Sequence, residues 1–294
     1  HWQAEWLQSN AFQEELGYWK QQLQGRLPLL DLPADKPVPS RLVSRGDTET
    51  LSLSADVVEK IKELCKREGI TMFMFFLAVF KTMLHRYTGQ EDILVGSPVA
   101  GRSPETEGVI GLFSYPSSLR TDVTGNLSFR DLLHRVREVT LGALAHKDLP
   151  FGRLVEELKV EQVQGRNPLF QVYFLHQTGF LQPLETPGLL WTPVTWVSPV
   201  TSFDLHLATL ERRGSVVARL EYNADIFDVA TIRQMLGHFR SIVRAVVADA
   251  GATLAELPLL TDAELQRIGI NSSRVLTEEH PGERPYELLE ENLR

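Results

Sequence analysis

Hydrophobic and polar positions near the start of the chain follow helix-like and strand-like patterns in turn. Over residues 6–23, large apolar residues recur at intervals of three to six positions, which predicts a helix. Polar and apolar residues alternate over residues 48–53, which predicts a strand, and a helix capped by Ser54 follows it. Residues 72–87 are apolar on almost every side, which predicts a buried helix closed by Gly89.

The remainder of the chain intersperses strands with helices. Short apolar runs predict buried strands, an alternating pair around Arg213-Gly214 predicts a hairpin, and two amphipathic stretches predict helices. In chain order these are the strand 92–97, the helix 128–145, the strand 169–176, the hairpin strands 205–211 and 215–222, and the helix 229–248. We therefore predict an α/β fold, a two-layer sandwich with a mixed sheet.

The pattern changes beyond Gly251, where the hydrophobic periodicity ends. The run Leu257-Pro258-Leu259-Leu260-Thr261 is followed by a polar stretch that prolines interrupt. Such a stretch is typical of a linker, and we expect it to lead into a further domain.

Composition and charge narrow the class of protein. The 294 residues are 43% hydrophobic and 23% charged, which is typical of a globular protein with a full core. The net charge of -8, without a basic run that carries aromatic residues, argues against nucleic acid as a partner. The single cysteine, Cys65, lies on the apolar face of a predicted helix, so we expect a buried structural thiol.

Neither secretion nor membrane insertion is expected. The first six residues lack the apolar core of a signal peptide, and the longest apolar run, residues 72–80, is too short to cross a bilayer. A chain that needs no disulfides fits the cytoplasm. We therefore expect a cytoplasmic protein with no membrane partner.

No self-sufficient catalytic motif occurs in the sequence. It contains no GxxxxGK[ST] loop, no GxGxxG after a strand, and no HExxH, CxxC or GxSxG. The eight histidines have no second His or Cys at ligand spacing, so no metal site is expected. We expect His134 and His238 to be exposed on helices. His206 alternates with apolar residues and is either a satisfied buried histidine or a functional one.

Three segments, taken together, carry a family resemblance. They are Val109-Ile110-Gly111-Leu112-Phe113 preceded by Ala100-Gly101-Arg102, then His146-Lys147-Asp148-Leu149-Pro150-Phe151, then Arg166-Asn167-Pro168-Leu169-Phe170-Gln171. In this order they resemble the fifth, sixth and seventh core motifs of nonribosomal peptide synthetase condensation domains. The flanking segments 92–98, 202–205 and 257–261 are similar to the family as well, so the resemblance covers roughly residues 1–260.

The resemblance implies a chloramphenicol-acetyltransferase-like fold, that of the CoA-dependent acyltransferases, and places this chain in its C-terminal lobe. In the family the catalytic histidine belongs to an HHxxxDG motif of the N-terminal lobe, and this sequence contains no such motif. We therefore expect residues 1–255 to be the C-terminal lobe and residues 256–294 to be the linker and the start of an adenylation domain. No catalytic residue is expected in this chain, which is expected to be inactive alone.

The resemblance also supplies candidate site residues. Ser114, Tyr115 and Asn167 are expected to line the substrate tunnel. Residues of the motifs that are expected to hold its shape are Gly111, Phe113, Asp148, Pro150, Phe151, Arg166 and Pro168. Tyr115 stands where the family commonly has an asparagine, within FVNT, and Gly152 stands where a glutamate is usual.

Asn167 has two interpretations, and Asp148 has one. Pro168 holds Asn167 extended, which would present its amide to a substrate amide or a pantetheine arm at the mouth of a strand. The alternative is a structural Asx turn that needs no ligand. Asp148 precedes Leu149-Pro150 and is expected to hold its own loop, as a turn or cap.

For the complete domain, the resemblance implies amide-bond formation between a carrier-bound acyl or peptidyl thioester and an aminoacyl thioester. The chain itself is expected to bind no cofactor, because phosphopantetheine is carried by the partner carrier domains. Expected partners are the N-terminal lobe, toward which residues 179–196 would reach, the upstream and downstream peptidyl carrier domains, and the adjacent adenylation domain. The alternative is a non-catalytic platform that docks a carrier beside an adenylation domain. A stand-alone acyltransferase is disfavoured by the adenylation-like tail.

Overall fold

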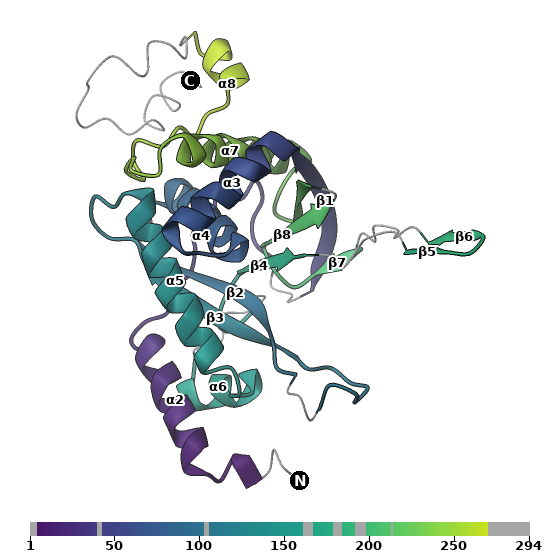
Figure 1. The fold of residues 1–294 in the computed structure, drawn as a ribbon. Helices are drawn as coiled ribbons and strands as arrows, with labels where there is room; N and C mark the ends of the chain where they lie inside the picture. Colours follow the sequence, from purple (N-terminus) through teal and green to yellow (C-terminus); the bar gives the residue numbers. More distant parts are fainter. Residues whose placement is uncertain are drawn as a thin grey trace. The chain divides into compact units, whose positions relative to one another are not determined.

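A seven-stranded mixed sheet organises the part of the chain that the structure describes (Figure 1). The computed structural model describes residues 5–39, 43–102, 106–160, 167–178, 184–191, 198–212 and 214–269. The strand order in this sheet is β3-β2-β4-β8-β9-β1-β7. Its strands are β1 (Ser44–Leu53), β2 (Asp92–Ala100), β3 (Ser114–Asp122), β4 (Val172–Gln177), β7 (Val200–Thr201), β8 (Leu205–Arg212) and β9 (Ser215–Asn223).

The strand directions confirm the predicted mixed sheet. β2, β4 and β8 run parallel to one another at its centre. The flanking pairs are antiparallel. On one side β3 pairs with β2, and on the other side β8 pairs with β9, β9 with β1, and β1 with β7. A separate short hairpin joins β5 (Leu184–Thr186) to β6 (Leu189–Trp191), within the segment that was expected to reach the N-terminal lobe. Residues 179–183 and 192–196 of that segment lie outside the described residues.

Helices cover one side of the sheet, as the two-layer prediction requires (Figure 1). They are α3 (Ala55–Glu68), α4 (Met72–Thr88), α5 (Phe129–Ala145) and α7 (Val229–Ala248). α4 packs on β2 and β4, α5 packs on β3, and α7 packs on β1 and β9. This arrangement buries the apolar stripe of each helix against the sheet or against α4.

The helix α4 is apolar on all sides because other elements surround it. α3, α5 and α7 contact it on one side, and the strands contact it on the other. It begins where the Thr71 hydroxyl accepts from the Met74 N–H at 3.2 Å, and it ends at Gly89 in the left-handed conformation with φ 65°. Among the described helices none is singly long and apolar enough to cross a membrane, and only α3 and α4 taken together, bent by 102°, pass that test.

Two further helices pack together beside β3. α2 (Asn10–Gln22) contacts α6 (Phe151–Leu158), and α6 contacts β3. α2 begins at Asn10 rather than near residue 6, because Ser9 caps it by accepting from the Phe12 N–H at 3.3 Å. Its buried face consists of Phe12, Leu16 and Trp19. The sequence patterns predicted α2 but predicted neither α6 nor β3.

Other predicted elements are present with shifted ends. β1 begins at Ser44, four residues earlier than the alternating pattern, and β4 begins at Val172, three residues later than expected. The hairpin prediction is confirmed, since β8 and β9 pair in register from Leu205 with Tyr222 to Arg212 with Ser215. Ser128 caps α5 through a complete capping box with Asp131.

One histidine prediction is wrong and the cysteine prediction is confirmed. His238 on α7 is buried rather than exposed, and its Nδ1 lies 2.6 Å from the Tyr87 hydroxyl of α4. His134 is exposed as expected. Cys65 is buried, and burial raises the pKa of its thiol to about 12. A thiol with that pKa is unreactive at neutral pH, which fits a structural role.

The chain divides into two compact units, residues 1–259 and residues 260–294. The segment that ends the first unit is held by Arg86 of α4, whose Nη1 donates to three backbone carbonyls. They are those of Leu254, Ala255 and Leu257, at 2.9, 3.0 and 2.6 Å. In the second unit, α8 (Asp262–Arg267) begins with a capping box formed by Thr261 and Glu264.

Candidate functional site

Ser114 and Tyr115 occupy the first two positions of β3. In the antiparallel pair with β2 they lie opposite Ala100 and Val99. Ser114 is exposed, and Tyr115 is half-buried and lies outside the hydrophobic core. We call this end of the β2–β3 pair, where Ser114 and Tyr115 face Ala100 and Val99, its open end, because the side chains there are at least partly accessible to a ligand.

Two buried hydroxyls follow Tyr115 inward along the same pair of strands. Ser97 and Ser117 lie opposite each other in register. Both are buried, and neither hydroxyl has a hydrogen-bond partner within the described part of the chain. Sequence reasoning did not single them out, although the two-residue spacing from Tyr115 places Ser117 on the same face.

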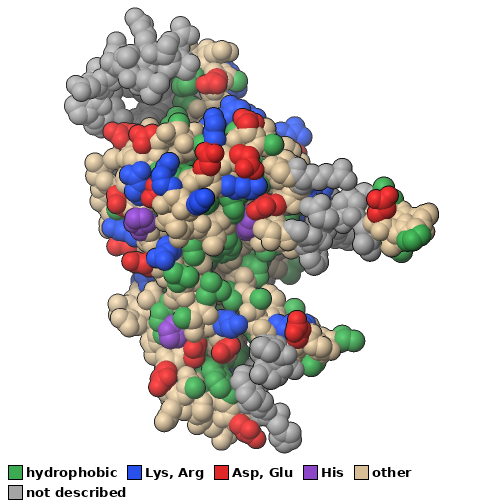
Figure 2. All heavy atoms as spheres, viewed as in Figure 1, with side chains coloured by type: hydrophobic (Ala, Val, Ile, Leu, Met, Phe, Trp, Pro, Cys, Tyr) green, Lys and Arg blue, Asp and Glu red, His purple; other side chains and the backbone are tan. Residues whose placement is uncertain are grey.

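The loop that leads into β3 is built around Arg102. The guanidinium of Arg102 donates to backbone carbonyls of the loop, and its Cζ lies 4.3 Å from the centroid of the Phe113 ring. Gly111 is exposed in this loop, and its neighbours Ile110 and Leu112 are 103% and 83% exposed. Figure 2 shows hydrophobic side chains at the end of the projection that the loop forms. The loop is thus internally fixed while its apolar side chains face outward.

The motif at residues 146–151 connects α5 to α6. Phe151 is the first residue of α6, and Pro150 before it is extended, with φ -61° and ψ 131°. Leu149 is buried. Asp148 is exposed, and its carboxylate makes no hydrogen bond to a described residue. The expectation that the Asp148 side chain holds its loop therefore has no support here. Gly152 faces open space, since an added Cβ would meet no atom within 4 Å.

The first residue of that motif, His146, joins a small titratable cluster with α2. Its Nδ1 lies 3.2 Å from Oε1 of Glu15, and its ring stacks on Tyr18 at 3.9 Å between centroids. Burial raises the pKa of Glu15, although the neighbouring His146 acts in the opposite direction. Burial, with Glu15 nearby, also raises the pKa of Tyr18. The Trp19 indole donates to the His146 carbonyl at 2.8 Å, so the cluster ties α2 to the end of α5.

Asn167 forms the Asx turn that was the structural alternative. Its Oδ1 accepts from the Leu169 N–H at 3.2 Å and, more weakly, from the Phe170 N–H at 3.5 Å. The side chain and Pro168 are half-buried. This turn delays the start of β4 to Val172. Arg166 lies outside the described residues.

An aromatic cluster, which sequence reasoning missed, lies on the sheet face opposite α3, α4, α5 and α7. Phe170 packs over Gly96 of β2, where an added Cβ would lie 2.2 Å from its ring. The ring of Tyr173 stacks on Phe203 at 4.7 Å, and Phe203 lies 6.0 Å from Phe170. Burial raises the pKa of Tyr173 to about 12. The pattern that would have found the cluster is one aromatic residue near each of two neighbouring parallel strands.

His206 of β8 completes the cluster, edge-on to Tyr173 at 5.2 Å. Burial, with Arg219 nearby, lowers the pKa of His206 to about 4, so the imidazole is neutral at physiological pH. Its Nε2 has no hydrogen-bond partner within the described ranges. His206 is half-buried and its Nε2 is unsatisfied, so it is not the fully satisfied buried histidine of one interpretation, and a functional role stays a prediction.

The structure brings some of the predicted residues together and keeps others apart. The ring of Phe151, from the sixth motif, packs against the ring of Phe170, from the seventh, with 5.7 Å between the ring centroids. Tyr115, however, shares a strand face with Thr121, and Lys81 of α4 donates a hydrogen bond to Thr121. Tyr115 therefore lies on the face that α4 covers, whereas Phe170 packs over Gly96 on the opposite face. No hydrogen bond or ring contact joins Tyr115 to Asn167 in the described structure. That these two side chains share one cleft stays a prediction.

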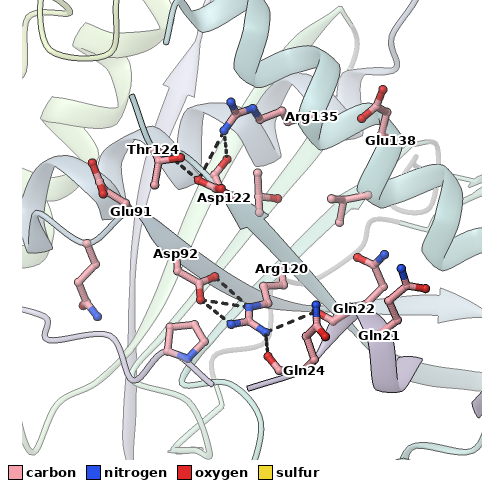
Figure 3. A pocket seen from close by; sticks show the side chains of 14 residues that line it. Gln21, Gln22, Gln24, Glu91, Asp92, Arg120, Asp122, Thr124, Arg135 and Glu138 are labelled. Carbon is pink, nitrogen blue, oxygen red and sulfur yellow. Dashed lines mark hydrogen bonds and ion pairs between the residues drawn. The ribbon is translucent and has the colours of Figure 1, made fainter. Parts of the chain in front are cut away.

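A polar pocket lies at the other end of the β2–β3 pair (Figure 3). It has a volume of about 880 Å³, and it contains none of the predicted site residues. Both of its arginines are paired with carboxylates: Arg120 donates to Asp92 at 2.8 Å, and Arg135 lies 3.5 Å from Asp122. Arg120 also donates to the Gln24 carbonyl at 2.7 Å, which fixes the chain after α2. We interpret this pocket as a structural junction.

Side chains that could ligate a metal are scattered rather than grouped. Within the described ranges, no group of three or more His, Cys, Asp and Glu side chains is arranged to hold a metal ion. The groups present at the open end of the β2–β3 pair are hydroxyl groups, backbone amides, apolar surface and the Arg102 guanidinium, which donates to loop carbonyls. Such groups position a substrate through hydrogen bonds and shape.

Comparison with known proteins gives a family. The family described as "Condensation domain" matches residues 1–268. A linear gramicidin synthase of Brevibacillus parabrevis is 44% identical over 271 residues, which is 91% of this chain and 5% of that protein. Phosphinothricin tripeptide synthetase PhsC of Streptomyces viridochromogenes is 36% identical over 269 residues, 91% of this chain and 25% of that protein. The chain therefore spans a small part of the length of these relatives.

Solved structures share the fold. A complex of the X-domain and OxyB from teicoplanin biosynthesis has a TM-score of 0.77 and 25% identity, over 86% of this chain and 56% of that one. The first condensation domain of the calcium-dependent antibiotic synthetase, bound to a substrate analogue, has a TM-score of 0.71 and 21% identity. This match covers 88% of this chain and 55% of that one. The predicted chloramphenicol-acetyltransferase-like fold is confirmed.

Proposed function

The chain belongs to the condensation domain family of nonribosomal peptide synthetases, and we propose that it is the C-terminal lobe of a domain that forms amide bonds. The proposal is carried by the family match over residues 1–268 together with the order of three motifs in this sequence. The condensation domain aligned above extends beyond the aligned part, since this chain covers 55% of it. We assign the uncovered part to the N-terminal lobe, which would supply the HHxxxDG histidine.

The proposed reaction joins two substrates that are tethered to carrier domains through phosphopantetheine. The amine nitrogen of the acceptor aminoacyl thioester attacks the carbonyl carbon of the donor thioester. A C–N bond forms, the C–S bond breaks, and the proton lost from the amine ends on the released thiol. Because the thioester is already activated, the domain contributes mainly positioning and proton transfer. Tethering adds a high effective concentration of both reactants.

The contribution of this chain would be one wall of the tunnel in which the substrates meet. Ser114 and Tyr115 stand at the accessible end of the β2–β3 pair and offer two hydroxyl groups that donate and accept hydrogen bonds. Tyr115 is bulkier than the asparagine that the family commonly has at this position, so it would narrow the tunnel. We expect the narrower tunnel to limit the size of the acceptor or donor side chain that fits.

Asn167 retains a polar group for this wall even though it forms a turn. Its Oδ1 is used by the turn, while its amide nitrogen is not engaged by any described residue. A half-buried amide N–H₂ is suited to bind a carbonyl oxygen of a substrate or of a pantetheine arm. The turn and the substrate contact are therefore compatible roles for one side chain.

A second candidate function is a binding platform without bond formation. It is favoured by the likeness to the X-domain from teicoplanin biosynthesis, whose structure was solved in complex with OxyB. In this version the lobe would dock a protein partner, or a carrier beside an adjacent adenylation domain, and the tunnel residues would be free of a catalytic role. The two functions differ in whether a new amide bond is formed.

Reconstitution from separate lobes tests the proposal. The chain is incubated with thioester-loaded donor and acceptor carriers, with and without a separately produced N-terminal lobe, and the acceptor carrier is followed by intact-mass spectrometry. We expect condensed product only when both lobes are present. Product from this chain alone would contradict the half-domain assignment. Absence of product with a lobe that demonstrably binds would contradict amide formation and favour the platform.

A further inference from the structure

We propose that Gly101 and Arg102 are positioning residues that fix where the ring of Tyr115 lies. The inference rests on the proposed function, because that function places Tyr115 in the tunnel wall. Gly101 and Arg102 would bind no substrate themselves. Their effect on the substrates that the domain accepts would act through Tyr115.

Gly101 leaves the space that the Tyr115 ring occupies. A Cβ added at Gly101 would lie 2.5 Å from Cε2 and 2.7 Å from Cδ2 of Tyr115. Such distances are sterically forbidden, so a larger residue at this position must displace the ring or the backbone. The backbone is held in place, because the Gly101 N–H donates to the Phe113 carbonyl at 2.6 Å, two residues before Tyr115. The ring is therefore the group that has to move.

Arg102 fixes the loop that joins Gly101 to β3. Its guanidinium lies inside the loop that leads into β3 and donates to four backbone carbonyls of that loop. They belong to Thr106, Glu107, Val109 and Gly111, at 2.5, 3.3, 2.8 and 3.4 Å. The same guanidinium covers the Phe113 ring. A planar group with five donors can hold several carbonyls at once, and the three donors of a lysine ammonium cannot reproduce that set.

Together the two contacts determine how the chain enters β3. The loop closes with the bond from Gly101 to Phe113, and Ser114 and Tyr115 follow as the first residues of the strand. The Tyr115 ring then lies against Gly101, next to the residue that organises the loop. Gly101 thus leaves room for the large ring of Tyr115, and Arg102 holds the loop that leads to it.

A double-mutant cycle tests the role of Gly101. Gly101→Ala is made with Tyr115 present and with Tyr115→Ala, in a condensation domain completed by its N-terminal lobe. The ratio of kcat/KM for a small and a large aminoacyl acceptor is the readout. We expect Gly101→Ala to change this ratio about fivefold or more when Tyr115 is present, and less than about twofold when it is Ala. Gly108→Ala is the matched control, since a Cβ there meets no atom within 4 Å.

Arg102 is tested independently of catalysis. In the chain itself, Arg102→Lys should speed limited proteolysis within residues 106–113. Arg86→Lys is the control, because it weakens hydrogen bonds to backbone carbonyls in another segment, and it should leave cleavage within residues 106–113 unchanged. In the completed domain, Arg102→Lys should also shift the acceptor ratio, and again only when Tyr115 is present. Unchanged cleavage in the loop would overturn the role of Arg102.

The outcomes separate this inference from the proposed function. A completed wild-type domain that forms no product refutes the proposed function, whatever the variants do. An active domain in which Gly101→Ala changes the acceptor ratio equally with and without the Tyr115 ring refutes the inference and leaves the function intact. If Gly101→Ala fails to fold, as judged by its melting temperature, Arg102→Lys carries the same test.

Discussion

The ammonium nitrogen of Lys81 lies 2.7 Å from the backbone carbonyl oxygen of Leu119, inside the hydrophobic core. The same nitrogen donates to Thr121 Oγ1 at 2.6 Å and to the Ile93 carbonyl at 3.3 Å. Lys81 is fully buried in α4, and burial lowers its pKa to about 7. One side chain therefore joins the helix layer to both β2 and β3, the strands at whose far end Tyr115 stands.

Replacing Lys81 by Met should remove a pH dependence of stability. Between about pH 7 and 10.5 the lysine is protonated in the unfolded chain but not in the folded one, so the wild-type free energy of unfolding rises with pH in this window. The expected slope is about 1.4 kcal/mol per pH unit. Relative to wild type, Lys81→Met should therefore be most stable near pH 7 and lose that advantage as the pH rises.

Urea unfolding at several pH values from 7 to 10 measures this difference. Lys62→Met is the control, because Lys62 is exposed and pairs with Glu59 at the surface. Stability profiles of Lys81→Met and wild type that run parallel across the window would show that Lys81 keeps its proton in the core.

Gly96→Ala should destabilise the protein by about 1–3 kcal/mol through overpacking. A Cβ at Gly96 would lie 2.2 Å from the Phe170 ring, which is buried between Gly96 and neighbouring aromatic residues. Gly152→Ala, in open space at the start of α6, should be neutral or slightly stabilising. Equal urea midpoints for the two variants would mean that Phe170 relaxes away from β2 without cost.

Two substitutions at Asn167 separate its turn from a substrate contact. Asn167→Asp keeps the acceptor that the Leu169 N–H uses but removes the amide N–H₂ donor, so stability should be nearly unchanged. Asn167→Ala removes both and should cost about 1 kcal/mol. In the completed domain, both variants should lose activity if the amide binds substrate. Full activity of Asn167→Asp would leave only the structural role.

Asp148→Ala should change the free energy of unfolding by less than about 0.5 kcal/mol, since the carboxylate is exposed and makes no hydrogen bond to a described residue. Leu149→Ala in the same loop should cost several times more, because Leu149 is buried in the core cluster. Thermal or urea unfolding of the two variants measures the contrast. A loss of about 1 kcal/mol or more for Asp148→Ala would restore the loop-holding role that its position before Leu149-Pro150 suggested.

Local patterns predicted the elements whose burial is visible in the sequence. The all-round apolar helix α4, the hairpin of β8 and β9, and the amphipathic helix α5 are each encoded by contiguous residues. The motifs then gave the fold, because their order identifies a family whose architecture is fixed. Both kinds of information are local in the chain or carried by its resemblance.

What the sequence did not predict depends on contacts between distant residues. β3 was missed because its sequence, SYPSSLRTD, is largely polar, which an edge strand of the described sheet tolerates. α6 is only eight residues long and follows a proline, so its periodicity is too short to recognise. His238 was expected to be exposed from its polar neighbours, but the Tyr87 hydroxyl from α4 provides its partner in the core. The stacking of Tyr173 on Phe203 likewise needs the strand order.

Tyr115→Ala tests most directly whether this chain supplies a wall of the substrate tunnel. In a domain completed by its N-terminal lobe, acceptor carriers loaded with small and large aminoacyl groups compete for one donor, and intact-mass spectrometry measures both products. We predict a shift of at least about fivefold in the product ratio toward the larger acceptor. The melting temperature should fall little, because Tyr115 is half-buried and lies outside the core. An unchanged product ratio in an active, folded variant would contradict the tunnel-wall assignment.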